Sequence, residues 1–110
     1  MNREFEQEVN QLHAEICAGL ADSKRITILY ELADAPKNVT ELGNTLDMPQ
    51  PMVSRHLKVL RERGMVTAVR RGPAVEYHLG DKRLIEALDL LRAVLRDHLS
   101  NRAELVGKLD

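Results

Sequence analysis

Apolar side chains in this chain recur first at helical spacing and then in alternation, so the spacing divides the sequence into elements. Apolar residues three or four positions apart, which are typical of helices with one packed face, occur over about 4–19, 23–35, 40–46 and 50–63. From Met65 to Leu79 apolar and polar residues alternate, as they do in paired strands. Helical spacing returns over about 81–106. The pattern predicts a mainly α fold of five helices and a small two-stranded β-hairpin, in the order α-α-α-α-β-β-α.

The first and last of these helices carry long apolar stripes. One stripe holds Phe5, Val9, Leu12, Ile16 and Leu20, and the other holds Leu84, Leu88, Leu91, Leu95 and Leu99. Two such helices present more apolar surface than one small core can cover. Because a symmetric dimer buries identical patches against each other, we expect the terminal helices, about 4–19 and 81–106, to form a homodimer interface.

Individual residues predict where the inner helices begin and end. Asp22 or Ser23 can cap the second helix, which ends before Pro36, and Thr40 is expected to cap the third. Pro51 fits the first turn of the fourth helix, since a proline there gives up an N–H that has no helical partner. Glycine at position 64 then stops this helix.

The stretch 39–79 combines two short helices, a tight turn at 47–49 and the hairpin. In the hairpin we expect a turn at Arg71, Gly72 and Pro73. Across this turn, the expected pairing places Val66, Ala68 and Arg70 opposite His78, Glu76 and Ala74, respectively. Two helices joined by a tight turn and followed by a hairpin are the layout of a winged helix-turn-helix.

Charge is distributed unevenly along the chain. At 110 residues the sequence is long enough for one modest core, so we expect a single domain over 1–110. The net charge is only −1, yet residues 50–71 carry six basic residues and one acidic residue. Because phosphate binding depends on Lys and Arg close to the nucleic-acid backbone, the local cluster favours a DNA interface where the net charge does not.

The fourth helix separates a packing face from a polar face. Val53, Leu57 and Leu60 form one stripe, and basic and hydroxyl side chains project from the other side. We predict that the polar side and the basic hairpin tip contact DNA. The predicted DNA-binding residues are Gln50, Ser54, Arg55, His56, Lys58, Arg61, Arg70 and Arg71.

Each of these predictions has an ordinary structural alternative. Ser54, Arg55 and Lys58 fit base and phosphate contacts in a major groove, or a solvated helix face. His56 lies at the margin of the apolar stripe, where a phosphate contact and a packing role both fit. Gln50 can read adenine or cap the helix. The two arginines at the hairpin tip fit the minor groove or a phosphate, or an ordinary solvated turn.

Four motifs together carry a family resemblance. They are the run from Leu20 to Leu29 with its Asp22-Ser23-Lys24-Arg25 core, the helix over 39–46, the helix over 50–64 with Ser54-Arg55-His56-Leu57, and the hairpin with Arg71-Gly72. With these motifs, nearly the whole chain resembles the ArsR/SmtB family of bacterial repressors. The resemblance implies a homodimeric winged-helix repressor on operator DNA, released when an inducer binds. Family members usually cap the reading helix with Ser or Thr, whereas this chain has Pro49, with Asp47 as the candidate substitute.

The sequence departs from the family where its sensors bind inducers. Members that resemble arsenic and cadmium sensors place two cysteines directly after the Glu-Leu pair found here at 41–42, and this chain has Gly, Asn and Thr instead. The zinc-ligand positions of the last helix correspond to Asp81, Arg83, Val94 and Asp97, so both histidines are missing. Persulfide sensors use a pair of cysteines. We therefore expect no metal of these kinds and no cofactor.

Three side chains remain as candidates for sensing. Cys17 is the only cysteine, so one chain forms no disulfide. His13 and Cys17 are four residues apart on the first helix, which fits a thiol activated by a base or an ordinary interface cysteine. His98 lies near the last apolar stripe, where a metal or pH role and a buried, hydrogen-bonded histidine are the alternatives. For release from DNA we expect either a redox or electrophile signal at Cys17 or no small-molecule inducer.

The leading hypothesis is a homodimeric, sequence-specific DNA-binding transcriptional regulator of the repressor type. The alternative is a protein-interaction module that uses a winged-helix scaffold without specific DNA reading. The sequence contains no recognisable nucleophile and base pair, metal constellation or phosphate-binding glycine loop, so we do not expect an enzyme. With one cysteine, no bilayer-spanning apolar run and no signal peptide or lipidation motif, we expect a cytoplasmic protein without a membrane partner.

Overall fold

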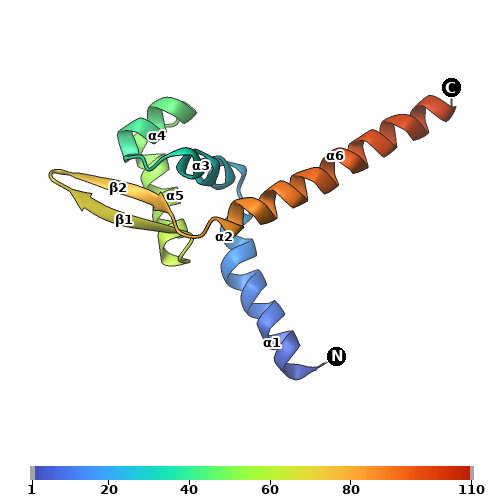
Figure 1. Cartoon of the computed structure of the whole chain (residues 1–110), viewed down its shortest axis with the longest axis horizontal. Helices are drawn as coiled ribbons and strands as arrows, with labels where there is room; N and C mark the ends of the chain where they lie inside the picture. The colour runs from blue at the N-terminus through green and yellow to red at the C-terminus, as the bar shows by residue number, and fades with distance from the viewer. Residues whose placement is uncertain (1, 110) are drawn as a thin grey trace.

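The computed structural model describes residues 2–109 and is mainly helical with one hairpin (Figure 1). Its elements are α1 (Arg3–Gln11), the π-helix η1 (Leu12–Cys17), α2 (Ala18–Leu20), α3 (Ser23–Asp34), α4 (Val39–Leu46), α5 (Gln50–Glu62), β1 (Val66–Arg71), β2 (Ala74–Leu79) and α6 (Arg83–Leu109). Since α1, η1 and α2 follow one another without a break, they form one helix with a wider turn inside it. The predicted fold class and element order are confirmed.

A small aliphatic core lies where α3, α4, α5, the hairpin and the start of α6 meet. The buried residues are Ile28, Leu29, Leu32, Leu42, Val53, Leu57, Leu60, Met65, Val66 and Leu88. The central helix α3 supplies three of these side chains and α5 another three, which explains why the apolar stripe of α5 reads so clearly in the sequence.

The two terminal helices project away from this core in different directions (Figure 1). The radius of gyration is 17.4 Å, against about 13 Å for a compact domain of this length. No side chain of α1 is buried, and Phe5, Leu91 and Leu95 are each at least half exposed, at 51%, 60% and 54%. The single chain therefore leaves the apolar stripes of both terminal helices uncovered.

The sequence spacing predicted a regular first helix, but the structure shows an irregular turn in it. At η1 the backbone hydrogen bonds span five residues instead of four, so the N–H of Ala18 donates to the carbonyl of His13. The guanidinium of Arg63 lies against this turn and donates from Nη1 to the carbonyls of Ala14 and Glu15, at 2.6 and 3.0 Å. The wide turn is therefore bonded to the residue that directly follows α5.

The caps of the inner helices agree with the sequence in one case and differ in another. Asp22 caps α3, since its Oδ1 accepts from the N–H of Lys24 at 2.8 Å. The prediction for Thr40 is wrong, because α4 begins two residues earlier at a capping box. There Asn38 accepts from the N–H of Glu41 at 2.8 Å and Glu41 accepts from the N–H of Asn38 at 3.1 Å. Two reciprocal bonds hold a helix start better than one hydroxyl.

The turn between α4 and α5 is closed by backbone rather than by side chains. Asp47 has φ of 53° and ends α4, and the N–H of Met48 donates to the carbonyl of Gly43 at 2.9 Å. Pro49 occupies the cap position of α5 and makes no side-chain cap bond. Asp47 therefore does not substitute for the missing Ser or Thr, because it is engaged in the left-handed turn at the end of α4.

The hairpin pairs one residue out of the predicted register. Val66 faces Leu79, Ala68 faces Tyr77 and Arg71 faces Ala74. The loop is thus only Gly72-Pro73, and φ of 60° at Gly72 followed by the fixed φ of proline suits a type II′ turn. The shift exchanges every cross-strand partner. A third strand segment joins the hairpin through two bonds between Lys37 and Tyr77, at 3.1 and 2.8 Å.

Candidate nucleic-acid interface

Helix α5 separates its side chains as the sequence predicts. Val53, Leu57 and Leu60 are buried in the core. The opposite side is exposed and presents the predicted DNA-binding residues Gln50, Ser54, Arg55, Lys58 and Arg61, together with the acidic Glu62. The structure therefore brings five of the eight predicted residues onto one exposed helix, supported from behind by the core.

Helix α4 holds α5 in place through a close backbone approach. Gly43 is buried, and a Cβ at this position would lie 2.9 Å from the carbonyl oxygen of Met48, too close for any side chain. At the start of α5, Nε2 of Gln50 donates to Oγ1 of Thr40 at 3.3 Å. Gln50 is thus bonded to α4 and does not cap its own helix.

His56 differs from its neighbours because it is half-buried. Burial lowers its pKa below 6.5, and the positive charges of Arg25, Arg55 and Lys24 act in the same direction. The carboxylate of Asp22 opposes this shift without cancelling it. Near neutral pH the imidazole is therefore uncharged, which favours packing over a charge-assisted phosphate contact.

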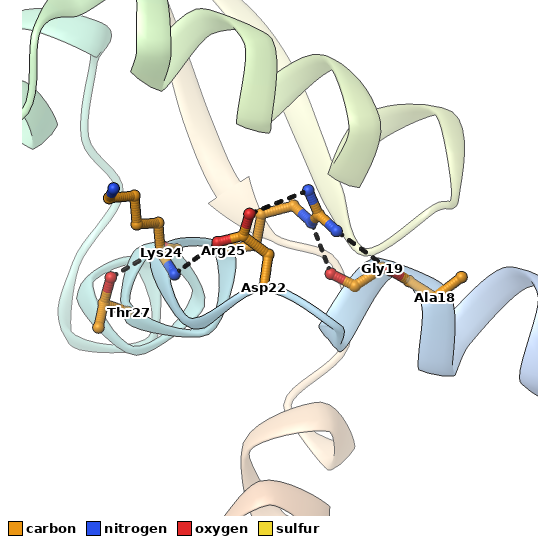
Figure 2. Close-up of polar contacts among 6 residues, drawn as sticks. All are labelled: Ala18, Gly19, Asp22, Lys24, Arg25 and Thr27. Atoms are coloured by element: carbon orange, nitrogen blue, oxygen red, sulfur yellow. Dashed lines mark hydrogen bonds and ion pairs between the residues drawn. The ribbon is translucent and has the colours of Figure 1, made fainter.

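The junction between α2 and α3 is organised by Arg25 (Figure 2), and its charged groups act on His56. Nε of Arg25 donates to the carbonyl of Gly19 at 2.7 Å, and Nη2 donates to that of Ala18 at 3.1 Å. Asp22 lies 3.7 Å from Nη1 of the same guanidinium, and its pKa is lowered chiefly by the N–H of Lys24. This role of Arg25 was not predicted from the sequence, although an arginine two residues into a helix that follows another helix is placed to bond the preceding carbonyls.

The two arginines of the hairpin point to opposite faces because they are consecutive in a strand. Arg70 is exposed and pairs in register with Val75. Arg71 lies on the other face with Glu76, and its Nε is 3.5 Å from Oε1 of that carboxylate. The same oxygen is 2.8 Å from Nε2 of His78. Glu76 thus restrains one of the two predicted wing contacts, a relation that the predicted register concealed.

The sensing candidates are exposed and lie apart from the α5 surface. His13 and Cys17 belong to η1, and His98 lies far along α6. Within residues 2–109, no three His, Cys, Asp or Glu side chains gather as a metal site would require. At the start of α6, Asp81 already holds Arg83 at 2.7 Å, and this hydrogen bond lowers the pKa of Asp81 to about 2. No helix among the described residues is long and apolar enough to cross a membrane.

These features define a class: a helix-turn-helix whose second helix is exposed, followed by a hairpin wing. A family model for the bacterial regulatory proteins of the arsR family matches residues 22–68. The arsenical resistance operon repressor of Bacillus subtilis is 31% identical over 80 residues, which cover 72% of this chain and 76% of that protein. The chain belongs to the ArsR family of transcriptional regulators.

Two proteins of Mycobacterium tuberculosis are also similar. The HTH-type transcriptional repressor SmtB is 40% identical over 78 residues, or 71% of this chain. The matched region spans only 58% of the length of SmtB. The crystal structure of Rv0081 superposes with a TM-score of 0.77 at 34% identity, covering 86% of this chain and 96% of that one. The fold and the family thus agree over most of the sequence.

Proposed function

We propose that the chain is a homodimeric, sequence-specific DNA-binding regulator that represses transcription. In this proposal α5 enters the major groove of operator DNA and the hairpin contacts the flanking backbone or minor groove. Similarity to two transcriptional repressors, SmtB and the arsenical resistance operon repressor, supports the direction of regulation. Because SmtB is covered only in part, the operator and the regulated genes are matters for experiment.

One observation carries the proposal: the two faces of α5. Its apolar face is fixed in the core by three fully buried side chains, so the helix has a defined orientation. Its other face presents Ser54, Arg55, Lys58 and Arg61 to solvent, in a chain whose net charge is −1. A rigid helix with hydroxyl and basic side chains directed outward suits the width and charge of a major groove.

The homodimer is supported by the terminal helices. Phe5 and Leu12 on the first helix are about half exposed, at 51% and 50%, and Leu91, Leu95 and Leu99 on α6 range from 49% to 60%. In aqueous solution, stripes of this kind are buried when two copies of the chain associate. A two-fold axis would place two copies of α5 on successive major grooves roughly 34 Å apart, which predicts an inverted-repeat operator.

The test uses selection of a binding site from random duplexes, followed by salt titrations of the selected site and of an unselected duplex. Arg55→Ala should weaken binding to the selected site by about 1–3 kcal/mol. Arg96→Ala is the matched control, because Arg96 is exposed on α6, away from α5. If no sequence is enriched, or if Arg55→Ala binds as tightly as the parent with the same salt slope, the proposal is wrong and a protein-interaction module becomes the better account.

Release from DNA is tested separately through Cys17. This thiol is exposed at the end of η1, close in sequence to the helix junction that Arg25 organises. Binding to the selected site is compared before and after mild oxidation in the parent and in Cys17→Ser. A response confined to the parent supports a redox signal, and an equal response in both proteins removes Cys17 from the mechanism.

A further inference from the structure

Arg63 joins two elements that the proposed function uses for different purposes. It directly follows α5, whose last residue is Glu62. Its Nη1 donates to the carbonyls of Ala14 and Glu15, at 2.6 and 3.0 Å, although these residues lie 49 and 48 positions earlier in the chain. The side chain thus connects the end of the exposed helix to the wide turn η1 of the first helix.

Both carbonyls that Arg63 binds, those of Ala14 and Glu15, belong to the wide turn η1. The N–H of Ala18 donates five residues back to His13, and regular α-helix follows from Ala18 onward. Where the backbone hydrogen bonds of a helix change from five-residue to four-residue spacing, one carbonyl receives no backbone N–H and needs another donor. A charged guanidinium is a strong donor for this purpose, since charge-assisted hydrogen bonds are about twice as strong as neutral ones.

Close packing at Gly19 holds the same junction from a second direction. Gly19 is buried, and a Cβ there would lie 2.6 Å from Sδ of Met65 and 3.1 Å from Cδ of Arg63. The helix therefore approaches the segment after α5 as closely as its backbone allows. Arg25 bonds the carbonyls of Ala18 and Gly19 on the α3 side (Figure 2). Beyond this junction, α1 extends outward with no buried side chain.

We propose that Arg63 is a positioning residue that sets the angle between the first helix and α5, and through it the separation of the two α5 helices in the homodimer. This inference rests on the proposed function. The direction of α1 is decided at η1, because that is where the helix leaves the core. A donor fixed to the end of α5 therefore ties the reading helix to the helix that would pair with the partner copy.

The competing role for Arg63 is a direct phosphate contact, since it belongs to the basic run 50–71. The two roles differ in their salt dependence. A lost phosphate contact weakens binding to every duplex and lowers the salt slope by about one. A lost positioning bond weakens binding only where the two α5 helices of a dimer must contact two half-sites at a fixed spacing. It leaves the salt dependence of binding to an unselected duplex unchanged.

The binding test compares Arg63→Met with the parent on the selected operator, on operators with one base pair added or removed between half-sites, and on an unselected duplex. Arg63→Met should lose about tenfold on the selected operator, discriminate less between spacings and bind the unselected duplex as the parent does. Arg61→Met, an exposed arginine two residues earlier, is the control and should lose affinity on all duplexes. Equal losses on all duplexes for Arg63→Met, or no loss on any, would overturn the inference.

A second measurement does not depend on DNA. Spin labels at Glu8→Cys and Lys58→Cys, in a Cys17→Ser background and diluted with unlabelled protein, report the distance between α1 and α5 within one chain. We expect one narrow distance distribution in the parent and a broad one in Arg63→Met. An unchanged distance distribution in Arg63→Met refutes the positioning role, whether or not the protein binds DNA. Failure of the unlabelled parent to bind any DNA refutes the proposed function and does not affect the distance measurement.

Discussion

The hydroxyl of Tyr30 donates to Oδ1 of Asp89 at 2.6 Å and so connects α3 to α6 across 59 residues of sequence. Arg92 lies over the ring of Tyr30, 5.2 Å from its centroid, and its Nη1 is 3.3 Å from both the hydroxyl and Oδ1 of Asp89. Leu88, one residue before Asp89, is the last buried side chain of α6 within the part up to Gly107 whose side chains the structure describes. The group therefore fixes the last point at which α6 is held by the rest of the chain.

Removing the Tyr30 hydroxyl should loosen this attachment. We expect Tyr30→Phe to lower the free energy of unfolding by about 0.5–1.5 kcal/mol, the usual net value of one hydrogen bond. A double-mutant cycle with Asp89→Ala, read by urea unfolding, separates the pair from other effects. Additive losses in the double variant would show that the two groups contribute independently and that the bond adds nothing to stability.

Removing the charge of Glu76 should strengthen DNA binding, if the proposed function is correct. In Glu76→Gln the side chain of Arg71 loses its ionic partner, and one negative charge leaves the predicted wing surface. We expect binding to an unselected duplex to tighten by about two- to fivefold, the range of an exposed ion pair. Glu104→Gln, which removes the same charge on α6, is the control. Equal gains for both variants would show a net-charge effect rather than a local one.

His56 should make the fold sensitive to mild acid. Its pKa is lowered mainly by burial, so the unfolded chain takes up the proton at a higher pH than the folded chain does. The contribution of this group is therefore complete above the ordinary value of 6.5, and stability declines as pH falls from there toward the lowered pKa. Urea unfolding at several pH values from about 7.5 to 5.5 should give a flatter profile for His56→Gln than for the parent. A profile for His56→Gln as steep as that of the parent would show that another group sets the acid sensitivity.

The proposed dimer should depend on the apolar stripe of α6. Leu95→Glu places a charge in the middle of this stripe, where a partner helix would have to bury it. We expect the variant to remain folded and to sediment as a monomer at concentrations where the parent is a dimer. Ser100→Glu, on a different side of the same helix, should leave the dimer intact. A dimeric Leu95→Glu would mean that other surfaces hold the two copies together.

The sequence predicted those parts of the fold that depend on periodic burial. The buried face of α5 follows from side-chain spacing alone, because the core selects one face of this helix, and the change to alternating spacing predicted the two paired strands. The sequence offered Asp22 or Ser23 as the cap of α3, since a short oxygen-bearing side chain accepts there, and the structure selects Asp22. The same reasoning placed the basic residues of α5 on the exposed side.

The differences arise where several local solutions compete. Asn38 and Thr40 are both acceptable caps, and the reciprocal bond with Glu41 decides between them only in three dimensions. Two-residue and three-residue turns both suit an Arg-Gly-Pro run, and φ of 60° at Gly72 selects the shorter one. The turn at η1 is absent from the spacing pattern altogether, and the side chain that bonds its carbonyls, Arg63, lies in a distant part of the chain.

The wide turn at η1 also gives one apolar run two directions. Each residue of a π-turn advances around the axis by a smaller angle than in an α-helix, so the phase of the helix slips where it passes through η1. Phe5, which lies before η1, and Leu12, which begins it, are exposed. Ile16 and Leu20, further along the helix, pack against the core. At regular α-helical spacing these four residues would share one side of the helix, as the sequence pattern predicts. The single irregular turn thus allows one continuous helix to belong to its own core at one end and to a partner copy at the other.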